Sequence, residues 1–248
     1  MSCQQHLTSA ESELDAGRPH LAIKFAQYAV TEEPDHQPGW ELLATAAMKA
    51  EDYPVAIDAY EHLSLTTPID SESRISLAIA YGGIGRHSLS KDLLMAVATG
   101  DPTAEQLLRI AAGLEAIDEP ELAMEACRQA GRRIPEAAEV HYQLAYYASK
   151  CGRPTALSES LMRHAVHLEP QSLHYRTGLT SLLIRLNRNA EARRVIDRMI
   201  PERLSEITCA CCVKRFANLF FDAGDLERAR LCAERFAELS PEASTAAT

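Results

Sequence analysis

Cysteine is the residue type in this sequence best suited to chemistry, and three cysteines stand almost side by side. Cys209 is followed by Cys211 and Cys212, and Cys232 lies further along the same part of the chain. Thiolates are good zinc ligands, and reactive thiols respond to oxidants. However, the spacing is not the repeated C-x-x-C of structural zinc sites, and buried cysteine often packs as a small hydrophobic residue. We therefore expect packing roles and no bound metal, and we keep a metal-binding or redox-responsive role of the Cys209–Cys212 cluster as an alternative.

Two histidines offer a second candidate for metal binding. His164 and His167 are three residues apart, so on one helix they would share a face. The neighbouring charged residues Arg163 and Glu169 are typical of a helix face in water. A solvated face explains the pattern, and we expect no metal ligation here.

Glycines and potential nucleophiles complete the search for chemistry. Gly82, Gly83 and Gly85 resemble a phosphate-binding loop, but no strand is expected before them and no Lys-Ser or Lys-Thr follows. A turn at the end of a helix explains these glycines. No potential nucleophile occurs in a motif that would also supply a general base to activate it. The sequence therefore predicts no enzyme activity and no cofactor.

The composition excludes several classes of protein. The chain has 248 residues, 46% of them apolar, and 25 Lys and Arg against 35 Asp and Glu, which gives a formal net charge of -10. These values exclude disordered, collagenous and disulfide-scaffold chains. Seven cysteines, an odd number, and an N-terminal stretch too polar for a signal peptide favour a reducing compartment. No apolar run approaches the length of a membrane span, so we expect a cytoplasmic protein without membrane insertion.

The charge is unevenly distributed along the chain. Residues 1–124 carry 7 basic and 20 acidic side chains, whereas residues 125–248 carry 18 basic and 15 acidic ones. The acidity therefore belongs to the first half. An anionic ligand remains compatible with the second half, since the field around a binding surface depends on the charges nearest to it.

Prolines recur with a period that organises the whole chain. Pro34, Pro68, Pro102, Pro135 and Pro170 are spaced by 34, 34, 33 and 35 residues. Each follows a stretch typical of a helix and ends it, because proline lacks the N–H and clashes with the preceding turn. A second set stands at the start of alanine-rich runs, where proline suits the first helical turn: Pro19, Pro54, Pro120 and Pro154. Glycines that end the helices before these runs are Gly17, Gly85, Gly152 and Gly224.

The repeated unit resembles the tetratricopeptide repeat (TPR), a helix pair of about 34 residues. The clearest copy has Trp40, Leu43 and Ala44 in its first helix and Ala56, Tyr60 and Pro68 in its second. The resemblance implies an all-α, right-handed superhelical solenoid of antiparallel helix pairs, with about seven repeats in a single domain over residues 1–241. The repeats are expected at 3–36, 37–70, 71–103, 104–137, 138–172, 173–207 and 210–241, followed by a flexible tail at 242–248.

The sixth copy departs most from the pattern. Leu179, Leu183, Ala192 and Ile196 match only if about two residues are inserted, and Pro201 comes early. It is the weakest match among the seven copies.

The resemblance also implies where a partner would bind. In this family, residues of the first helices line a concave groove at a spacing of four and then three or four. That register selects Ile75, Ile79, Leu108, Tyr142, Tyr146, Lys150, Thr177, Ser181, Arg185, Lys214 and Asn218. The same register puts Cys212 on the buried face and Cys211 on the concave one. Packing of the tyrosines and isoleucines between repeats, with the basic residues merely solvated, remains an open alternative.

We predict a protein-protein interaction module, a scaffold or adaptor that binds a peptide segment or helix of another protein in this groove. A partner with apolar anchors and an acidic end would suit the tyrosines and the basic residues. A homo-oligomerising structural solenoid is the alternative. An arginine-rich stretch comprises Arg185, Arg188, Arg193, Arg194 and Arg198. Glu191 and Asp197 interrupt it, so we expect a solvated helix face and no nucleic-acid binding.

Overall fold

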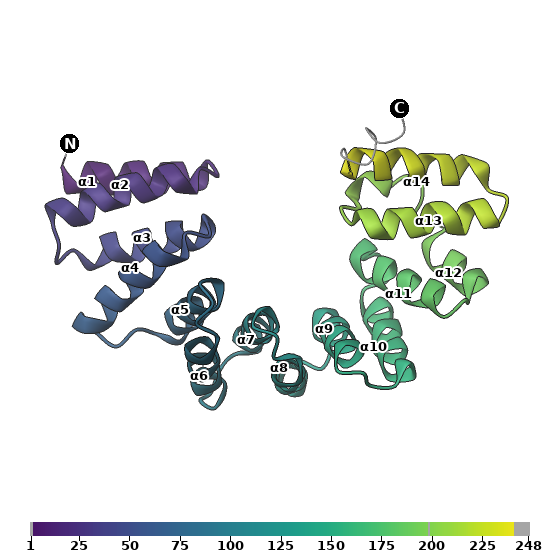
Figure 1. Cartoon of the computed structure of the whole chain (residues 1–248), viewed down its shortest axis with the longest axis horizontal. Helices are drawn as coiled ribbons and strands as arrows, with labels where there is room; N and C mark the ends of the chain where they lie inside the picture. The colour runs from purple at the N-terminus through teal and green to yellow at the C-terminus, as the bar shows by residue number, and fades with distance from the viewer. Residues whose placement is uncertain (1, 198, 241–248) are drawn as a thin grey trace. The chain divides into compact units, whose positions relative to one another are not determined.

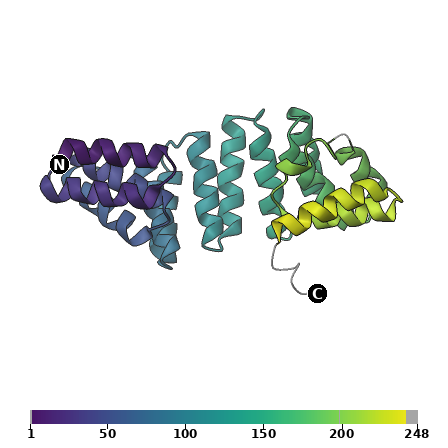
Figure 2. The same cartoon turned by 90° about the horizontal axis from the view of Figure 1, so that it is seen from above.

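The chain folds into α-helices joined in pairs (Figure 1, Figure 2). The structure, a computed structural model, describes residues 2–197 and 199–240. Within these ranges every regular element is helical, which confirms the predicted all-α class. Among the described helices, none combines the length and the apolar composition needed to cross a membrane. Arg198, Pro241 and the predicted tail at 242–248 lie outside the described residues.

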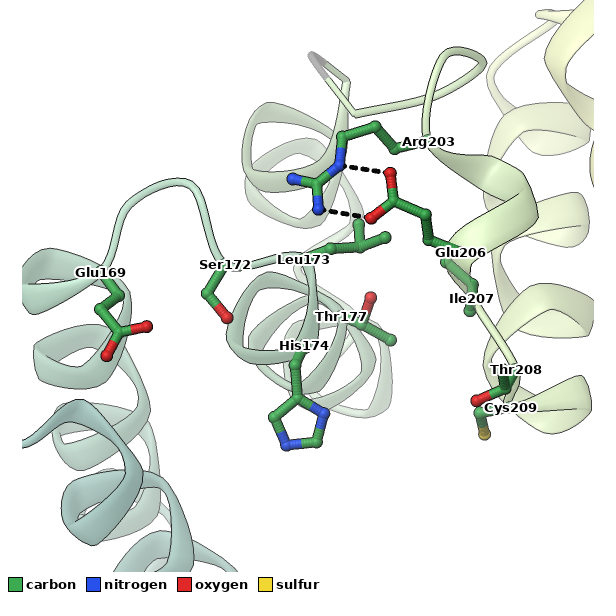
Figure 3. Close-up of a pocket in the computed structure, with 10 residues that line it drawn as sticks. All are labelled: Glu169, Ser172, Leu173, His174, Thr177, Arg203, Glu206, Ile207, Thr208 and Cys209. Carbon is green, nitrogen blue, oxygen red and sulfur yellow. Dashed lines mark hydrogen bonds and ion pairs between the residues drawn. The ribbon is translucent and has the colours of Figure 1, made fainter. Parts of the chain in front are cut away.

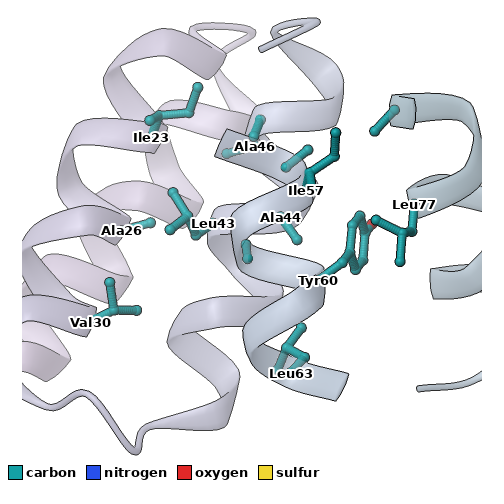
Figure 4. Close-up of a cluster of buried hydrophobic side chains, with 14 of the residues drawn as sticks. Ile23, Ala26, Val30, Leu43, Ala44, Ala46, Ile57, Tyr60, Leu63 and Leu77 are labelled. Carbon is teal, nitrogen blue, oxygen red and sulfur yellow. The ribbon is translucent and has the colours of Figure 1, made fainter. Parts of the chain in front are cut away.

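Residues 1–133 form one compact unit, here unit 1. Its helix pairs are α1 (Cys3–Asp15) with α2 (Pro19–Glu32), α3 (Gln37–Lys49) with α4 (Tyr53–Thr66), α5 (Ser71–Gly83) with α6 (His87–Ala98), and α7 (Ala104–Ala116) with α8 (Pro120–Arg133). Buried side chains from neighbouring pairs form a continuous core, part of which is shown in Figure 4. Each pair thus covers an apolar face that it could not bury alone.

The described residues from 134 to 240 form a second compact unit, here unit 2. Its helix pairs are α9 (Ala138–Lys150) with α10 (Thr155–Leu168), α11 (Leu173–Arg185) with α12 (Asn189–Ile196), and α13 (Ala210–Asp222) with α14 (Leu226–Leu239). A short 3-10 helix, η1 (Leu204–Glu206), lies between α12 and α13. Leu183, Ile196, Phe216 and Phe220 are at the centre of its core. A single solenoid domain that runs through both units stays a prediction.

Small residues at the helix contacts allow this packing. Ala44, Ala78 and Ala145 each have no exposed surface. An alanine leaves room for a neighbouring helix to approach closely, while larger residues fill the space beside it. Trp40 is one such residue, and its ring stacks on His62 with 3.9 Å between the ring centroids. Close packing at alanine, expected from the repeat, is therefore present in both units.

A side chain near the start of several first helices binds the carbonyl of the proline that ends the preceding repeat. Trp40 Nε1 donates to Pro34 O at 2.7 Å. His141 Nε2 lies 2.6 Å from Pro135 O in the same relative position. The partner is six residues earlier in both cases, so this contact fixes the direction in which the chain enters the helix. It also satisfies a carbonyl close to a helix end, where partners within the helix are missing.

Each turn within a pair contains one residue in the left-handed conformation. Four are the predicted glycines, with φ between 64° and 79°. Glu51, Asp118 and Asn187 take the same place in the other pairs, with φ of 57°, 62° and 57°. In all seven turns the next N–H donates to the carbonyl five residues earlier at 2.8–2.9 Å, as in Arg86 N to Tyr81 O. This is the hydrogen bond of a Schellman motif, which ends a helix and reverses the chain.

The sixth pair, whose sequence matches the repeat least well, is also irregular in structure. Its second helix, α12, has only 8 residues, against 12–14 in the second helices of the other pairs. Proline removes a helical hydrogen bond, and Pro201 stands where that helix would otherwise continue. The segment between α12 and α13 instead packs Met199, Ile200 and Ile207 into the core of unit 2. The longer connection sets where α13 begins.

The turns make a first testable prediction. Gly85 has φ of 79°, and a Cβ added to it would meet no other atom within 4 Å, so a substitution there causes backbone strain without a clash. Gly85→Ala should lower the free energy of unfolding by about 1 kcal/mol, because L-residues are strained in this conformation. Glu51→Gly should raise it by up to about 1 kcal/mol by removing that strain.

Urea unfolding followed by circular dichroism measures both effects. Gly85→Asn is the matched control, since asparagine tolerates the left-handed conformation better than alanine and should fall between glycine and alanine. Equal stability of the alanine and asparagine variants would contradict the explanation.

Candidate functional site

A groove of about 530 Å³ opens on the surface of unit 2. Its walls come from α9, α10, α11 and the start of α13. Six of the predicted groove residues line it: Tyr142, Tyr146, Lys150, Thr177, Ser181 and Arg185. The other lining residues are Ser149, Ser158, Met162, His174, Gly178, Leu182, Cys209, Cys212 and Arg215. The structure thus brings together the predicted residues of two consecutive first helices.

Aromatic rings form one wall of this groove. The ring of Tyr142 lies 4.5 Å from that of His174 and 5.2 Å from that of Tyr175, measured between centroids. Tyr175 is buried, and its hydroxyl donates to Glu139 Oε2 at 3.0 Å. Burial, followed by the charges of Cys212 and Glu139, raises the pKa of Tyr142 to about 12. Its hydroxyl therefore stays protonated at neutral pH and remains a hydrogen-bond donor.

Gly178 makes room for the Tyr142 ring. A Cβ at this position would lie 2.5 Å from Tyr142 Cε2 and 2.6 Å from its hydroxyl oxygen. Glycine inside a helix costs about 1 kcal/mol relative to alanine. That cost is accepted here because only a residue without a side chain lets the ring lie against α11. The depth of the groove depends on this contact.

Hydroxyl groups lie buried beneath the surface of the groove. Ser158 Oγ and Thr177 Oγ1 are buried and have no hydrogen-bond partner within the described part of the chain. Ser181 is also buried, and its hydroxyl donates to Cys212 Sγ at 3.5 Å. Buried polar atoms without partners are uncommon in proteins.

The charge of the groove is entirely positive. Lys150, Arg185 and Arg215 line it, and none of its lining residues is Asp or Glu. The ammonium group of Lys150 lies 5.2 Å from the ring centroid of Tyr146. Within the described residues, Arg185 and Arg215 form no ion pair, and both are exposed. Their guanidinium groups are thus available to a carboxylate from outside the unit.

A second hollow, of about 450 Å³, adjoins the groove (Figure 3). The two share His174, Thr177 and Cys209. Arg203 lines this second hollow, but two hydrogen bonds of 2.6 and 2.7 Å tie its guanidinium to Glu206. The carboxylate of Glu206 compensates the positive charge of Arg203, so the second hollow differs from the groove in its charge.

Five predicted residues do not line the groove. Ile75 is completely buried in unit 1, so it packs between helices, which was the alternative left open for the isoleucines. Ile79 packs close to Gly113 of α7, and Leu108 is half-buried in the same unit. Lys214 lies 5.4 Å from the ring centroid of Phe236, and Asn218 faces a different hollow on α13 and α14.

Arg215 and His174 are groove residues that sequence reasoning missed. The predicted register assigned Lys214 to the groove, whereas the structure presents Cys212 and Arg215 from α13. The connection before α13 is irregular, so the spacing of the earlier repeats does not carry over to this helix. His174 and Tyr175 are adjacent in the sequence. No pattern there indicates that His174 lines the groove whereas Tyr175 is buried.

The cysteine cluster lies at the edge of the groove. Cys209 immediately precedes α13, and its sulfur is 3.0 Å from that of Cys211. The sulfur atoms of Cys209, Cys211 and Cys212 all lie within 4.8 Å of one another. Cys232 is buried in the core instead, and burial raises the pKa of its thiol to about 11. The predicted packing role therefore suits Cys232, whereas Cys209 and Cys211 are exposed.

The other chemical candidates have structural explanations. His164 and His167 are exposed, and their rings lie 6.4 Å apart. Gly82 and Gly83 belong to the last turn of α5, so they form no phosphate-binding loop.

Within the arginine-rich stretch, Arg188 is engaged in ion pairs. Arg188 binds Glu191 at 2.7 Å and Glu159 at 2.6 Å, and Arg163 binds Glu191 at 2.9 Å and Glu159 at 2.8 Å. The hydrogen bond from Arg163, the largest influence, and that from Arg188 lower the pKa of Glu159 against the opposing effect of burial. Charges compensated in this way contribute little to the attraction of phosphate groups.

Comparison with solved structures identifies the fold. No family model matches the chain, and no curated protein does. A tetratricopeptide repeat protein from Parabacteroides merdae aligns with a TM-score of 0.70 and 14% identity, over 96% of this chain and 93% of the other. PilF of Pseudomonas aeruginosa aligns with a TM-score of 0.66 and 15% identity, over 83% and 92%. A thermophilic TPR protein of Thermus thermophilus gives 0.52 and 19%, over 74% and 100%. The predicted resemblance is confirmed at the level of the fold.

The contact between Gly178 and Tyr142 makes a second prediction. Gly178→Ala should destabilise the protein by about 1–3 kcal/mol through overpacking, although alanine is the better helix former. In a Tyr142→Ala background the same substitution should stabilise it by about 0.5–1 kcal/mol, because the ring is gone. A double-mutant cycle measured by urea unfolding gives the coupling energy. A coupling energy of zero would show that the ring does not lie against Gly178.

Proposed function

We propose that this chain, with the helix pairs of the tetratricopeptide fold, is a non-enzymatic interaction module that holds a segment of another protein in the groove of unit 2. The segment has acidic side chains together with an apolar or aromatic anchor. The module acts as a scaffold or adaptor, because its contribution is a shaped surface and not a reaction.

The observation that carries this proposal is the one-sided charge of the groove. Lys150, Arg185 and Arg215 line it, without any acidic side chain among the lining residues. Hydrogen bonds between guanidinium and carboxylate groups are among the stronger ones in proteins, and Arg can bind a carboxylate with two parallel bonds. A positive groove also accelerates the encounter with an acidic partner at low salt. The total charge of -10 does not oppose this, because charges more than about 10 Å away are screened at physiological salt.

The aromatic wall supports an apolar anchor in the same segment. Tyr142 and Tyr146 offer rigid, amphipathic surface that loses little conformational entropy on binding. Met162 and Leu182 add apolar contacts beside them. These features favour a peptide over a purely ionic ligand.

Selection of peptides tests this function. Random peptides displayed on phage are selected on the immobilised full chain, and a selected peptide is then synthesised with a fluorophore for anisotropy titration. We expect selected sequences to combine Asp or Glu with an apolar or aromatic residue. Arg185→Ala and Arg215→Ala should each weaken binding by about 1.5–3 kcal/mol, that is roughly tenfold or more, since each removes a hydrogen bond to a charged group.

Arg194→Ala is the matched control. Arg194 is exposed on α12 and does not line the groove, so its loss changes the net charge by the same amount without touching the ligand. Binding to this variant should equal that of the wild type. Selected peptides without acidic residues, or equal affinity of all three arginine variants, would contradict the proposal.

Self-association is a second candidate, and a specific surface favours it. Phe221 and Leu226 are 65% and 64% exposed. They line a hollow of about 370 Å³ on α13 and α14 together with Ala217, Ala229 and Ala233. Contiguous apolar surface of this kind commonly marks an interface.

Light scattering over a range of protein concentrations tests self-association. If a second copy of the chain covers this surface, the mass should rise with concentration for the wild type and stay that of a monomer for Phe221→Ser with Leu226→Ser. A monomer at every concentration for both proteins would exclude this function.

A further inference from the structure

Three cysteine sulfurs converge at one point of unit 2. The sulfurs of Cys209, Cys211 and Cys212 lie within 4.8 Å of one another, and those of Cys209 and Cys211 are 3.0 Å apart. In a zinc site with Zn–S bonds of about 2.3 Å, tetrahedral geometry separates the sulfurs by about 3.8 Å. Small rotations about the side-chain bonds therefore suffice to bring all three sulfurs to a common ion.

The location at the beginning of α13 favours thiolates. Cys209 is the residue before the helix, and Cys211 and Cys212 are in its first turn. The first N–H groups of a helix have no partner within it and carry a partial positive charge, which stabilises a nearby anion. Arg215 follows in the next turn and lines the same groove as Cys209 and Cys212. The negative charge of three thiolates is thus opposed by positive charge from both the helix and a side chain.

The sulfurs are also accessible from solvent. Cys209 and Cys211 are exposed, and Cys212 is half-buried. By contrast, Cys3 and Cys232 are buried. An ion can therefore reach the cluster through the groove, which the packed cysteines do not allow.

From this geometry we propose that Cys209, Cys211 and Cys212 form a three-thiolate binding site for a thiophilic metal ion such as Zn(II) or Cu(I). Soft thiolate ligands select such ions, whereas Mg²⁺ and Ca²⁺ require oxygen ligands. The three sulfurs leave one coordination position of a tetrahedral ion for water or for a group in the groove. The site does not depend on the proposed peptide binding, because the helix start and the sulfurs alone define it.

One other group of potential ligands occurs among the described residues. Cys3, Glu33 and His36 in unit 1 also have donor atoms within 4.8 Å of one another. However, Nδ1 of His36 already accepts a hydrogen bond from Gly39 N at 3.1 Å, and Cys3 is buried. This group is the less suitable one, and it provides an internal control.

Titration with metal ions tests the site. The full chain, reduced and freed of metal, is titrated with Cd(II), whose bonds to sulfur give a charge-transfer absorption. Zn(II) and Cu(I) are then measured in competition with a chromophoric chelator. We expect one equivalent of Cd(II) per chain with sulfur ligation, and an affinity that rises with pH because the thiols must lose protons. Cys211→Ser should weaken binding at least about tenfold, since even outer partners of a metal site are worth about 10–100-fold.

Matched variants separate this site from the rest of the chain. Cys211 is exposed, so its serine variant should keep the helical circular dichroism spectrum of the wild type. Cys151→Ser and Cys3→Ser should keep the full equivalent of Cd(II) and the wild-type affinity. Absence of a sulfur-bound equivalent, unchanged binding by Cys211→Ser, or loss of binding only in Cys3→Ser would each overturn the proposal.

Discussion

One backbone constraint recurs in every helix pair: a residue in the left-handed conformation, followed by an N–H bonded to the carbonyl five residues earlier. This motif reverses the chain within about three residues and orients the second helix relative to the first. Where the connection to the next pair is regular as well, the first helices of consecutive pairs present equivalent faces. In unit 2, that equivalence is what brings side chains of α9 and α11 into one groove, although they are more than thirty residues apart in the sequence.

The sequence predicted the elements whose cause is local. Prolines and turn glycines mark helix ends through their own backbone chemistry, and Pro19, Pro54 and Pro120 do stand in the first turns of α2, α4 and α8. Glu51, Asp118 and Asn187 were not predicted because nothing in these residue types requires a left-handed conformation; the repeat imposes it.

The groove was predictable only as far as the repeat is regular. Tyr142, Tyr146, Thr177 and Ser181 follow from counting along α9 and α11, and the structure gathers them. Counting fails for α13 because the chain before it is not a repeat but a short α12, a 3-10 turn and buried loop residues. Ile75 is buried against a neighbouring helix and does not face solvent. Contacts between helix pairs decide this, and the spacing of residues within one helix gives no information about them.

The left-handed turns alternate between glycine and other residues along the chain: Gly17, Glu51, Gly85, Asp118, Gly152, Asn187 and Gly224. Strain in that conformation is about 1–2 kcal/mol for most L-residues and near zero for glycine. The stability of a repeat protein is approximately the sum of the stability of each repeat and of its contacts with its neighbours. The helix pairs therefore do not contribute equally to the free energy of unfolding. The pair that turns at Glu51 starts from a lower intrinsic stability than its neighbours that turn at glycine, whereas Asp118 and Asn187 carry less of this strain.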